Sequence, residues 1–487
     1  MSDELAWMPA TEMRAAIRER RLSPVEVTQA LLDRIDRLNP ALNAYTPPTH
    51  EMALAGARSA EAAVMRGEQL GPLHGVPLSI KDLFDVQGLP TTKGSLIYKD
   101  RIAQGYEISV KRLLDAGAIH LGKTNTPEFG FLPTTENPLF GPTYNPWDIR
   151  RTPGGSSGGA GAAVAAGLGP IALGSDGGGS IRIPSSFCGI FGIKPTYGRV
   201  ARNPGGWSTF THRGPMSRTV SDAALMLDVI AGHEPADPYS VADYPGSFLD
   251  EVDLGVRGLR IAWSPDLGYA PVEPEVRDIC ERAAKRFADL GCTVEEASPA
   301  IANPNADRTF ITLAAAADAV WLGELTPEQL AQVGPTAHFF LETGSKVTGM
   351  EYVRANERRM KLWHAMRQFH DTYDLLLTPA VSVTAFPVGE PPKLIGGHDY
   401  APLGWSPYTA AFNLTGQPAA SVPCGFDAQG LPVGLHIVGR AYDDSLVLRA
   451  ARAFEQLQPW AQHHPPIDQW AAAANAPLST VREGATQ

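Results

Sequence analysis

The chain contains little cysteine. Four residues of this type occur among 487, at Cys188, Cys280, Cys292 and Cys424. No two of them lie at the short spacing of metal-binding or disulfide-rich sequences, so neither a zinc site nor a disulfide framework is predicted. We expect isolated, buried thiols of the kind found in a reducing cytosol.

The sequence also lacks an excess of basic residues and long hydrophobic runs. Its formal net charge of −11 argues against a nucleic-acid partner, because such a surface needs clustered Lys and Arg. The longest weakly polar stretch, residues 158–174, is mostly Gly and Ala and is shorter than a membrane span. The N-terminus has no basic segment followed by an apolar one, so no signal peptide is predicted. We expect a soluble, cytoplasmic protein without a membrane partner.

Hydrophobic residues make up 44% of the chain and charged residues 19%, which is ordinary for a folded globular protein. The first part of the chain, about residues 1–70, is predicted to be helical. Ser23 is a good N-cap and Glu26 would close a capping box with it. The apolar spacing that follows predicts a helix that ends at residues 39–40, and a second helix is predicted over residues 51–66.

Short apolar strands then alternate with helices, which predicts an α/β sheet with helices on its faces. The first strand, at residues 76–80, carries Lys81 and Asp82 at its C-terminal end. No internal repeat or long linker divides the chain. The remaining predicted elements are helix 109–116, strand 119–121, an Ala/Gly-rich helix after residue 157, strand 259–263, helix 273–290, strand 292–296, a helical segment over about 305–373, strand 375–377, a long Pro/Gly loop, strand 433–438 and helix 444–458.

Residues 117–124 match the phosphate-binding Walker pattern. That site requires a strand before the loop and a helix after it, so that backbone N–H groups face the phosphates. The predicted order here is the reverse, because a helix ends near residue 117 and a strand follows. The phosphate-binding interpretation is therefore disfavoured.

Residues 154–158 fit the Gly-x-Ser-x-Gly nucleophile elbow, which needs an acid and a histidine later in the chain. His436 lies in a strand pattern and residues 463–464 lie in a tail, so both are poor partners. Alternatively, the glycines only permit tight turns. That alternative does not explain why two glycine runs each lead to a serine, Ser156 and Ser180, downstream of a lysine that ends a buried strand.

These residues sit in motifs that resemble those of the amidase signature family over nearly the whole chain. The resemblance implies an α/β fold in which helices cover both faces of a large, mixed, twisted β-sheet. It implies one domain over residues 1–487, with a helical region at about 1–70, a catalytic core at about 71–235, and a variable, partly helical substrate-side region at about 300–410. The matching segments are 75–82, 122–129, 153–159, 174–184, 187–199, 214–215, 378–379, 413–419 and 431–435.

The resemblance implies a catalytic triad of Ser180 as nucleophile, Ser156 as proton relay after a cis peptide bond, and Lys81 as base. Ser157 is a rival relay, or a hydrogen-bonding neighbour. A serine hydroxyl needs a nearby base. A lysine serves only when it is uncharged, and desolvation behind a buried strand lowers its pKa in that direction. The structural alternative is that Lys81 pairs with neighbouring Asp82.

We expect the backbone amides of Gly177, Gly178, Gly179 and Ser180 to form an oxyanion hole, because glycines let successive N–H groups converge. Many members of the family carry Thr at the position of Gly177, so this loop is expected to be roomier. Asp176 and Arg182 flank the nucleophile. They are expected to hold the loop, with a local surface ion pair as the alternative.

The implied reaction is hydrolysis of an amide bond through an acyl-enzyme at Ser180, without a metal or cofactor. The partner is then a small-molecule amide, and anilides, hydrazides, esters and carbamates share its tetrahedral intermediate. An apolar or aryl substrate is suggested by candidate pocket aromatics. Members of the family are often dimers, so a homodimer is one assembly that the resemblance allows. The pocket candidates are Phe129, Phe131, Trp207, Phe210 and Trp405.

One alternative lies inside the family, the A-type subunit of glutaminyl-tRNA amidotransferase. Such subunits usually carry Gln at the position of Ile183, and they have a longer, Met/Asp-bearing version of residues 126–129. Both departures favour a free-standing hydrolase. A non-catalytic binding protein with the same fold is disfavoured because all three triad residues are present.

Overall fold

The computed structural model describes residues 2–47, 49–203, 208–301, 305–399 and 404–474. Within this part of the chain, ten strands form one sheet in the order β2-β1-β3-β5-β4-β11-β12-β8-β6-β7. A separate hairpin is formed by β9 (Leu394–Ile395) and β10 (His398–Asp399). The ten strands are β1 (Pro77–Lys81), β2 (Ile119–Thr124), β3 (Ile171–Asp176), β4 (Phe191–Lys194), β5 (His212–Ser217), β6 (Arg260–Trp263), β7 (Thr293–Glu296), β8 (Leu375–Pro379), β11 (Ala419–Phe426) and β12 (Pro432–Val438).

The sheet is mixed, as the family resemblance implied. Strands β2, β1 and β3 run parallel at one end, and β8, β6 and β7 run parallel at the other. The strands between them pair antiparallel. Parallel strands are usually covered on both faces, which explains why β1, β2, β3 and β8 are buried along their whole length.

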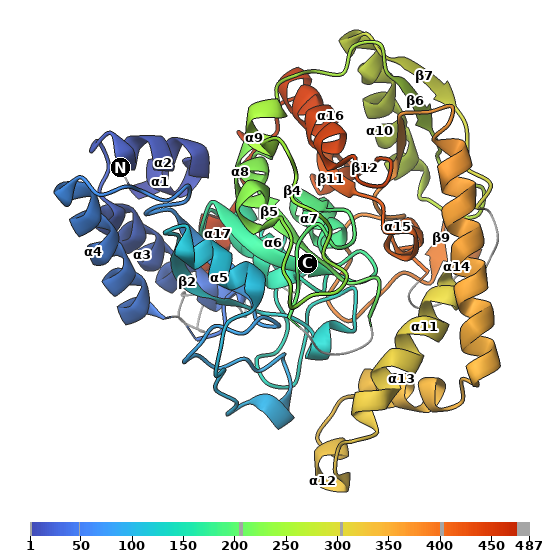
Figure 1. Cartoon of the computed structure of the whole chain (residues 1–487), viewed down its shortest axis with the longest axis horizontal. Helices are drawn as coiled ribbons and strands as arrows, with labels where there is room; N and C mark the ends of the chain where they lie inside the picture. The colour runs from blue at the N-terminus through green and yellow to red at the C-terminus, as the bar shows by residue number, and fades with distance from the viewer. Residues whose placement is uncertain (1, 48, 204–207, 302–304, 400–403, 475–487) are drawn as a thin grey trace, which may run out of the picture.

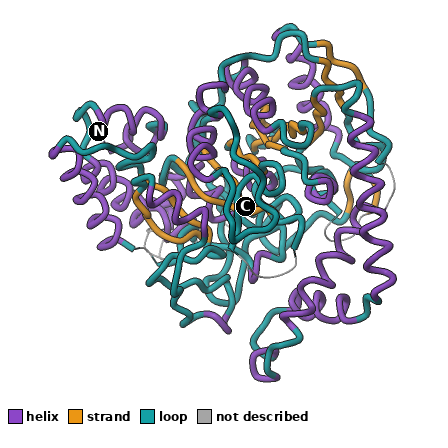
Figure 2. The backbone as a smooth tube through the Cα atoms, viewed as in Figure 1, coloured by secondary structure: helices purple, strands orange, loops and turns teal. Residues whose placement is uncertain are grey.

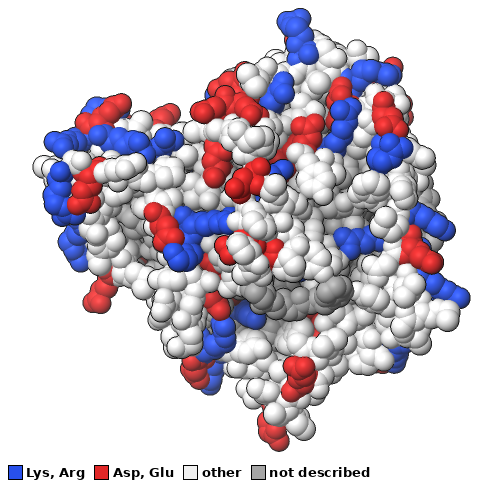
Figure 3. Space-filling view, in the orientation of Figure 1, with Lys and Arg blue, Asp and Glu red and all other residues white. Residues whose placement is uncertain are grey.

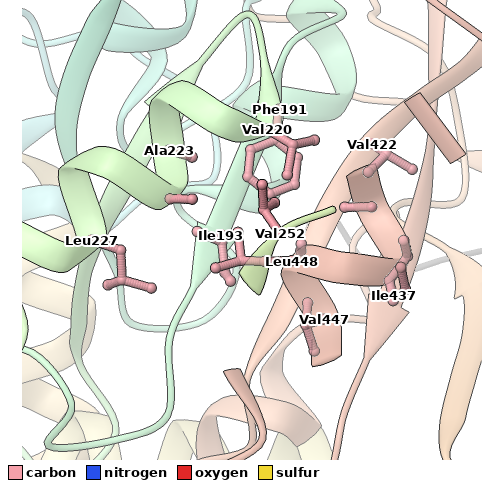
Figure 4. Packing of buried hydrophobic residues seen from close by; sticks show 14 of the residues in the cluster. Phe191, Ile193, Val220, Ala223, Leu227, Val252, Val422, Ile437, Val447 and Leu448 are labelled. Carbon is pink, nitrogen blue, oxygen red and sulfur yellow. The ribbon is translucent and has the colours of Figure 1, made fainter. Parts of the chain in front are cut away.

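Helices cover both faces of this sheet (Figure 1). Alternation along β8 makes the two layers visible, because Leu375 and Leu377 join one buried cluster while Leu376 joins another. Figure 4 shows part of the first cluster, where Phe191 and Ile193 of β4 meet Val220 and other helical residues. The helices of this layer include α5 (Ile108–Asp115), α8 (Val220–Ile230), α9 (Phe248–Glu251), α10 (Pro274–Lys285) and α16 (Asp444–Leu457).

The N-terminal region is helical, as predicted, and lies at one end of the molecule (Figure 1). The Ser23 side chain caps the first long helix by accepting from the backbone N–H groups of Val25 and Glu26. The capping box predicted between Ser23 and Glu26 is not formed; the Ser23 hydroxyl donates to the Glu61 carboxylate instead. The helix also continues through Pro40 to Leu42, so its predicted end was wrong. The helices are α1 (Ser2–Trp7), α2 (Ala10–Arg18), α3 (Pro24–Leu42) and α4 (His50–Arg66).

The predicted helical segment near residues 305–373 forms an arm at the opposite end of the molecule from the N-terminal helices (Figure 1). It packs against the second buried cluster. Figure 2 shows that long loops, rather than helices, gather between these two helical regions in the lower part of the view. The helices of the arm are α11 (Asn305–Leu322), α12 (Pro327–Leu330), α13 (Pro335–Ser345) and α14 (Gly349–Phe369).

The predicted Pro/Gly loop before residue 433 was wrong, because it contains the helix α15 (Ala410–Thr415) and the central strand β11. The tail after residue 458 likewise contains α17 (Ile467–Ala474). The remaining helices are α6 (Gly158–Ala165), α7 (Arg182–Cys188) and the short turns η1 (Leu96–Tyr98), η2 (Glu128–Gly130) and η3 (Arg286–Leu290).

All four cysteines are buried and unpaired, but they are not all isolated. The sulfur atoms of Cys280 in α10 and Cys424 in β11 lie 3.9 Å apart, which sequence spacing could not indicate. Among the described residues, no group of His, Cys, Asp and Glu is arranged to hold a metal ion. No described helix has the length and apolar character needed to cross a bilayer. Basic and acidic side chains are interspersed on the face shown in Figure 3.

Candidate active site

Lys81 ends β1 and its side chain is completely buried. Within the described chain, every hydrogen-bond partner of its Nζ atom is a serine hydroxyl. These are Ser156 Oγ at 2.7 Å, Ser157 Oγ at 3.0 Å and Ser175 Oγ at 3.0 Å. Burial lowers the pKa of Lys81 well below its ordinary value; the charge of Asp176 opposes this shift and that of Arg213 adds to it. The amine is therefore desolvated and is not neutralised by a carboxylate contact.

Asp82, the next residue, takes no part in this cluster. Its carboxylate forms a buried ion pair with Lys123 at 2.9 Å and also accepts from Thr92 N at 3.2 Å. The alternative in which Lys81 pairs with Asp82 is thus wrong. Lys123 lies inside β2 and donates to Phe84 O at 2.7 Å, so the Walker-like segment forms a strand and its lysine is structural.

The Gly155–Ser156 peptide bond is cis, as the resemblance implied. Gly155 has no room for a side chain, because a Cβ atom there would lie 2.3 Å from Thr134 O. Ser156 is 2% exposed, so its hydroxyl lies at the inner edge of the site beside the Lys81 amine. Gly130 also borders Ser156, since a Cβ atom at Gly130 would lie 3.3 Å from Ser156 Oγ.

Ser180 stands between β3 and α7 and is partly exposed. Its carbonyl accepts from Ser157 N at 3.1 Å, which holds the two serine-bearing turns together. Within the part of the chain that the structure describes, its hydroxyl makes no hydrogen bond to Ser156 or to Lys81. The structure therefore brings Lys81 and Ser156 into contact, while the Ser180 side chain, on a partly exposed residue, is not hydrogen-bonded to either of them.

Asp176 and Arg182 lie on either side of the glycine run and are both fully buried, so the surface ion-pair alternative is wrong. Arg182 Nη2 and Nε each lie 2.9 Å from the Asp176 carboxylate. Burial alone would raise the pKa of Asp176, but the charge and hydrogen bonds of Arg182, with a hydrogen bond from Asn413, outweigh it and lower this pKa. The carboxylate is a fixed anion that organises the loop.

The glycine loop leaves some of its amides free and uses others. Gly179 N donates to Asp176 Oδ1 at 2.7 Å, so the prediction that this amide joins the oxyanion hole was wrong. Gly179 also has φ +133°, and a Cβ atom there would lie 2.4 Å from Thr409 Oγ1. The amides of Gly177, Gly178 and Ser180 donate to no acceptor in the described chain, and they remain the candidate donors.

Sequence reasoning missed three residues that support the loop. Ser175, the penultimate residue of β3, is the third hydroxyl on Lys81 Nζ. Thr409 Oγ1 donates to Gly178 O at 2.6 Å, and Asn413 Nδ2 donates to the Asp176 carbonyl at 3.0 Å. Thr409 and Asn413 reach the loop from α15 and its N-cap, far away in the sequence. For Asn413 a signal existed, since it opens one of the motifs that carry the resemblance.

Two aromatic side chains of α11, Phe310 and Trp321, pack on candidate pocket residues and were not predicted from the sequence. Phe310 lies over the loop, because a Cβ atom at Gly178 would come 2.9 Å from its ring. It packs edge-on against predicted Phe210 at 5.4 Å between ring centroids. Trp321 packs edge-on against predicted Phe129 at 4.9 Å.

The other three residues predicted to line the pocket are Phe131, Trp405 and Trp207. Phe131 is partly buried and stacks on Phe340 of α13 at 4.6 Å. Trp405 is 1% exposed and stacks on Phe187 at 5.5 Å within a separate buried cluster, so it is core packing and not a pocket wall. Trp207 lies outside the described residues.

His436, the histidine required by a nucleophile elbow, lies in β12 and is fully buried. Its ring nitrogens contact Arg182 Nη1 at 3.2 Å and Thr378 Oγ1 at 3.4 Å, and no serine is among its hydrogen-bond partners in the described chain. The structure therefore combines an α/β fold with a buried serine–lysine cluster, and it does not place His436 as the partner of a nucleophile elbow.

Comparison with known proteins gives the family. A family model described as Amidase matches residues 26–448. The chain belongs to this amidase family, and it is an amide-hydrolysing enzyme. An acylamidase from Rhodococcus erythropolis is 41% identical over 478 residues, which cover 95% of this chain and 98% of that protein. The A-type subunit of a glutamyl-tRNA(Gln) amidotransferase from Moorella thermoacetica is 38% identical over 492 residues, covering 95% and 99%.

Solved structures agree with this assignment. The structure of a bacterial aryl acylamidase of the amidase signature family superposes with a TM-score of 0.88 at 32% identity, covering 97% of this chain and 99% of that one. A 6-aminohexanoate cyclic dimer hydrolase superposes with a TM-score of 0.87 at 31% identity, covering 95% and 99%. The expected fold, a large mixed sheet with helices, is confirmed.

Proposed function

We propose that this enzyme hydrolyses small apolar or aryl amides through an acyl-enzyme at Ser180, with Ser156 as proton relay and neutral Lys81 as base. The observation that carries the proposal is the environment of Lys81, a fully buried amine whose hydrogen-bond contacts are three hydroxyls. A buried ammonium without a carboxylate partner is strongly disfavoured, so the neutral form is favoured.

Hydrogen-bond directions support the relay. A neutral amine has two N–H donors and one lone pair. The Ser157 hydroxyl donates to Ser175 O at 3.1 Å, so toward Lys81 it acts as an acceptor and uses one amine N–H. If the Ser175 hydroxyl accepts the second N–H of Lys81, the nitrogen lone pair faces Ser156. The distance to Ser156 Oγ, 2.7 Å, is the shortest of the three. Ser156 can then pass its proton to Lys81 as it takes one from Ser180.

In the proposed cycle the Ser180 oxygen attacks the amide carbonyl while its proton moves through Ser156 to Lys81. The C–N bond breaks as this proton returns to the leaving nitrogen, which gives an acyl-Ser180 and a free amine. Water then attacks the ester by the same proton route, releasing the carboxylic acid. The free amides of Gly177, Gly178 and Ser180 would hold the negative oxygen, and each such donor is typically worth about 3–4 kcal/mol.

The substrate class is proposed from the aromatics near the loop. Phe310 borders Gly178 and packs on Phe210. Phe129 packs on Trp321 and directly precedes Gly130, which borders Ser156. Such surfaces favour an apolar or aryl group on the acyl or amine side. Of the similar proteins, the bacterial aryl acylamidase is named for an aryl substrate. Anilides, hydrazides, esters and carbamates remain within reach of the same chemistry.

The proposal is tested with a chromogenic 4-nitroanilide. We expect a burst of nitroaniline followed by slower turnover whenever deacylation is the slower step, and an acyl adduct on the Ser180 peptide by mass spectrometry after rapid quenching. Ser180→Ala should remove both turnover and adduct while the protein stays folded. Ser421→Ala is a matched control, because the Ser421 hydroxyl is buried without a partner in the described chain and lies outside the site. Undiminished hydrolysis by Ser180→Ala would exclude the mechanism.

The second candidate is an amidotransferase A-type subunit, favoured by the 38% identity to the Moorella thermoacetica protein. Glutaminase activity together with a partner subunit that stays bound through purification would support it. Anilide hydrolysis by the isolated chain, without glutaminase activity, would support the free-standing amidase.

A further inference from the structure

A cavity of about 490 Å³ lies between α11, α13 and α14, on residues that the proposed reaction does not use. It opens to the surface of the helical arm. Its walls come from the first turns of α11, the second half of α13 with the residues that follow it, and the first half of α14. The lining residues are Arg308, Thr312, Phe339, Glu342, Thr343, Lys346, Val347, Glu351, Arg354 and Arg358.

The charge of this cavity is opposite to that of the protein. Its walls carry four basic and two acidic side chains, a net charge of +2, whereas the whole chain carries −11. Basic groups collected in a hollow of an acidic protein create a local positive potential that attracts anions. The cavity is thus a positively charged site in a negatively charged protein.

Within the described parts of the chain, the three arginines of the cavity form no ion pair, but the Glu351 carboxylate is near two of them: after the hydrogen bonds from Thr348, the charges of Arg308 and Arg354 also lower the pKa of Glu351. Lys346 forms an ion pair with Glu342 at 2.6 Å, which neutralises one basic group internally. Glu351 accepts from Thr348 N and Thr348 Oγ1, both at 2.9 Å, in the capping box of α14. Among the described residues, no carboxylate lies within ion-pair distance of Arg308, Arg354 or Arg358.

The arginines are also placed to act together. Arg354 and Arg358 are four residues apart on α14, so they lie on neighbouring turns of one face. Arg358 Nε donates to the buried Thr309 Oγ1 at 3.0 Å, which orients its guanidinium group and leaves both Nη groups available. Arg308 approaches from α11. Glu351 offsets part of the repulsion among these positive charges, and an anion bound between them would offset the rest.

The remaining walls are apolar or hydroxylic. The Phe339 ring is 50% exposed and Val347 is partly buried, while Thr312 and Thr343 supply hydroxyls. A guanidinium cluster binds planar or tetrahedral oxyanions through paired N–H donors. An apolar wall beside it favours a ligand that joins such an anion to a compact hydrophobic group.

We propose that the cavity between α11, α13 and α14 is a binding site for a small organic oxyanion, a carboxylate or phosphate group attached to a compact apolar body. The three arginines would hold the anionic group, and Phe339 would cover the apolar part. Its lining on α11 differs from that of the proposed reaction site, because Arg308 and Thr312 stand two residues on either side of Phe310, and residues two apart on a helix do not share a face.

The test is calorimetric titration of the full chain with benzoate, phenyl phosphate and inorganic phosphate. We expect benzoate or phenyl phosphate to bind, and the stronger of the two identifies the source of the anionic group. Arg354→Gln and Arg308→Gln should each weaken this binding by about tenfold or more, because each removes charge-assisted hydrogen bonds. Amide hydrolysis and thermal stability, measured alongside, report whether each variant remains folded.

Lys361→Gln is the matched control, since it removes one positive charge from an exposed position of α14 that does not line the cavity. It should bind the probes as the unmodified protein does. A carboxylate could also occupy the reaction site as a product, so only the binding lost in the arginine variants is assigned to the cavity. Absence of binding, or equal binding by the arginine variants, would overturn the proposal. Phosphate binding as tightly as phenyl phosphate would overturn the role of Phe339.

Discussion

The Nζ atom of Lys81 lies 2.7 Å from the hydroxyl oxygen of Ser156, inside the protein. The adjacent Asp82 would be the natural counter-ion, but it points instead to Lys123, 2.9 Å away. Successive residues at a strand end face opposite sides of the sheet, so the fold separates this acid from this base. Asp82 thereby neutralises a structural lysine, and Lys81 stays without an anion.

The first prediction concerns the base itself. Lys81→Met keeps the length and the apolar stem of the side chain but removes the amine that would accept the Ser180 proton. We expect kcat/KM for a 4-nitroanilide to fall by ~10⁴-fold or more, as for the loss of a member of other serine triads. Lys361→Met, at an exposed site, should retain full activity. A Lys81→Met enzyme that keeps a tenth of the normal rate would rule out Lys81 as the base.

The second prediction is the sign of the pH dependence. Burial lowers the pKa of Lys81, so the amine is charged below that lowered pKa and neutral above it. The rate should therefore rise with pH through the lowered pKa and level off well below the ordinary lysine value of about 10.4. A profile of kcat/KM from about pH 4.5 to pH 9.5, with an anilide that does not titrate there, measures this. A rate that falls as pH rises over this range would contradict a neutral base.

The same shift has a consequence for stability. Between the lowered folded pKa and the ordinary unfolded value of about 10.4, the unfolded chain binds the Lys81 proton and the folded chain does not. Unfolding then takes up a proton, so this residue makes the protein less stable at lower pH and the penalty fades as pH rises. Lys81→Met should remove that contribution, and the slope of unfolding free energy against pH in urea titrations should decrease in this window.

The third prediction concerns the buried ion pair behind the loop. Asp176→Asn leaves the Arg182 guanidinium buried without its anion and weakens the hydrogen bonds to Gly179 N and Ile181 N. Unpairing a buried charge typically costs about 3–5 kcal/mol. Urea denaturation should show a loss of this size, and activity should fall because the loop loses its anchor.

A surface ion pair provides the control for that experiment. Glu295 and Arg260 pair at 2.9 Å with 42% and 50% of their side chains exposed. Glu295→Gln makes the same chemical change as Asp176→Asn, but in water it should cost less than about 1 kcal/mol. Equal losses for the two variants would mean that Asp176 does not anchor the loop.

Part of the fold could be read from local patterns, and part could not. The capping of α3 by Ser23 follows from short-range rules, and so does the first strand, which was predicted at residues 76–80 and lies at Pro77–Lys81. Strand β11 was not predicted because Pro423 and Gly425 disfavour a strand. The structure accommodates both residues at a shift in the pairing register of β11 with β12. The helix end expected at Pro40 was wrong because the helix continues for one further half-turn after the proline, which lacks only one backbone donor.

The site divides in the same way. Lys81 and Ser156 stand in short motifs, and the contact between them agrees with what the family resemblance implied. The role of Ser180 stays a prediction. Thr409 and Asn413 contact Arg182 across 227 and 231 residues of chain, and no local pattern encodes such contacts. The hydrogen bond from the Gly179 amide to Asp176 could not be predicted either, because it depends on the orientation of a carboxylate three residues away.

The last prediction concerns substrate selection by α11. The Phe310 ring lies over Gly178 and packs against Phe210, so it should contact the group carried by the acylated serine more than the reacting atoms themselves. Phe310→Ala should open space there. We expect KM for small acyl anilides to rise by about tenfold, while bulkier acyl groups lose less or gain, because an aromatic contact is worth about 0.5–1.5 kcal/mol beyond its buried area.

A series of 4-nitroanilides with acyl chains of increasing size measures this selectivity in both enzymes. Phe426→Ala is the control, since Phe426 is 36% exposed at the end of β11 and packs on Trp147, which is not part of the aromatic surface around the glycine loop. It should leave the order of preference unchanged. If Phe310→Ala lowers kcat equally for every acyl group with KM unaffected, Phe310 supports the loop and does not select the substrate, because a loss made only in the transition state appears in kcat.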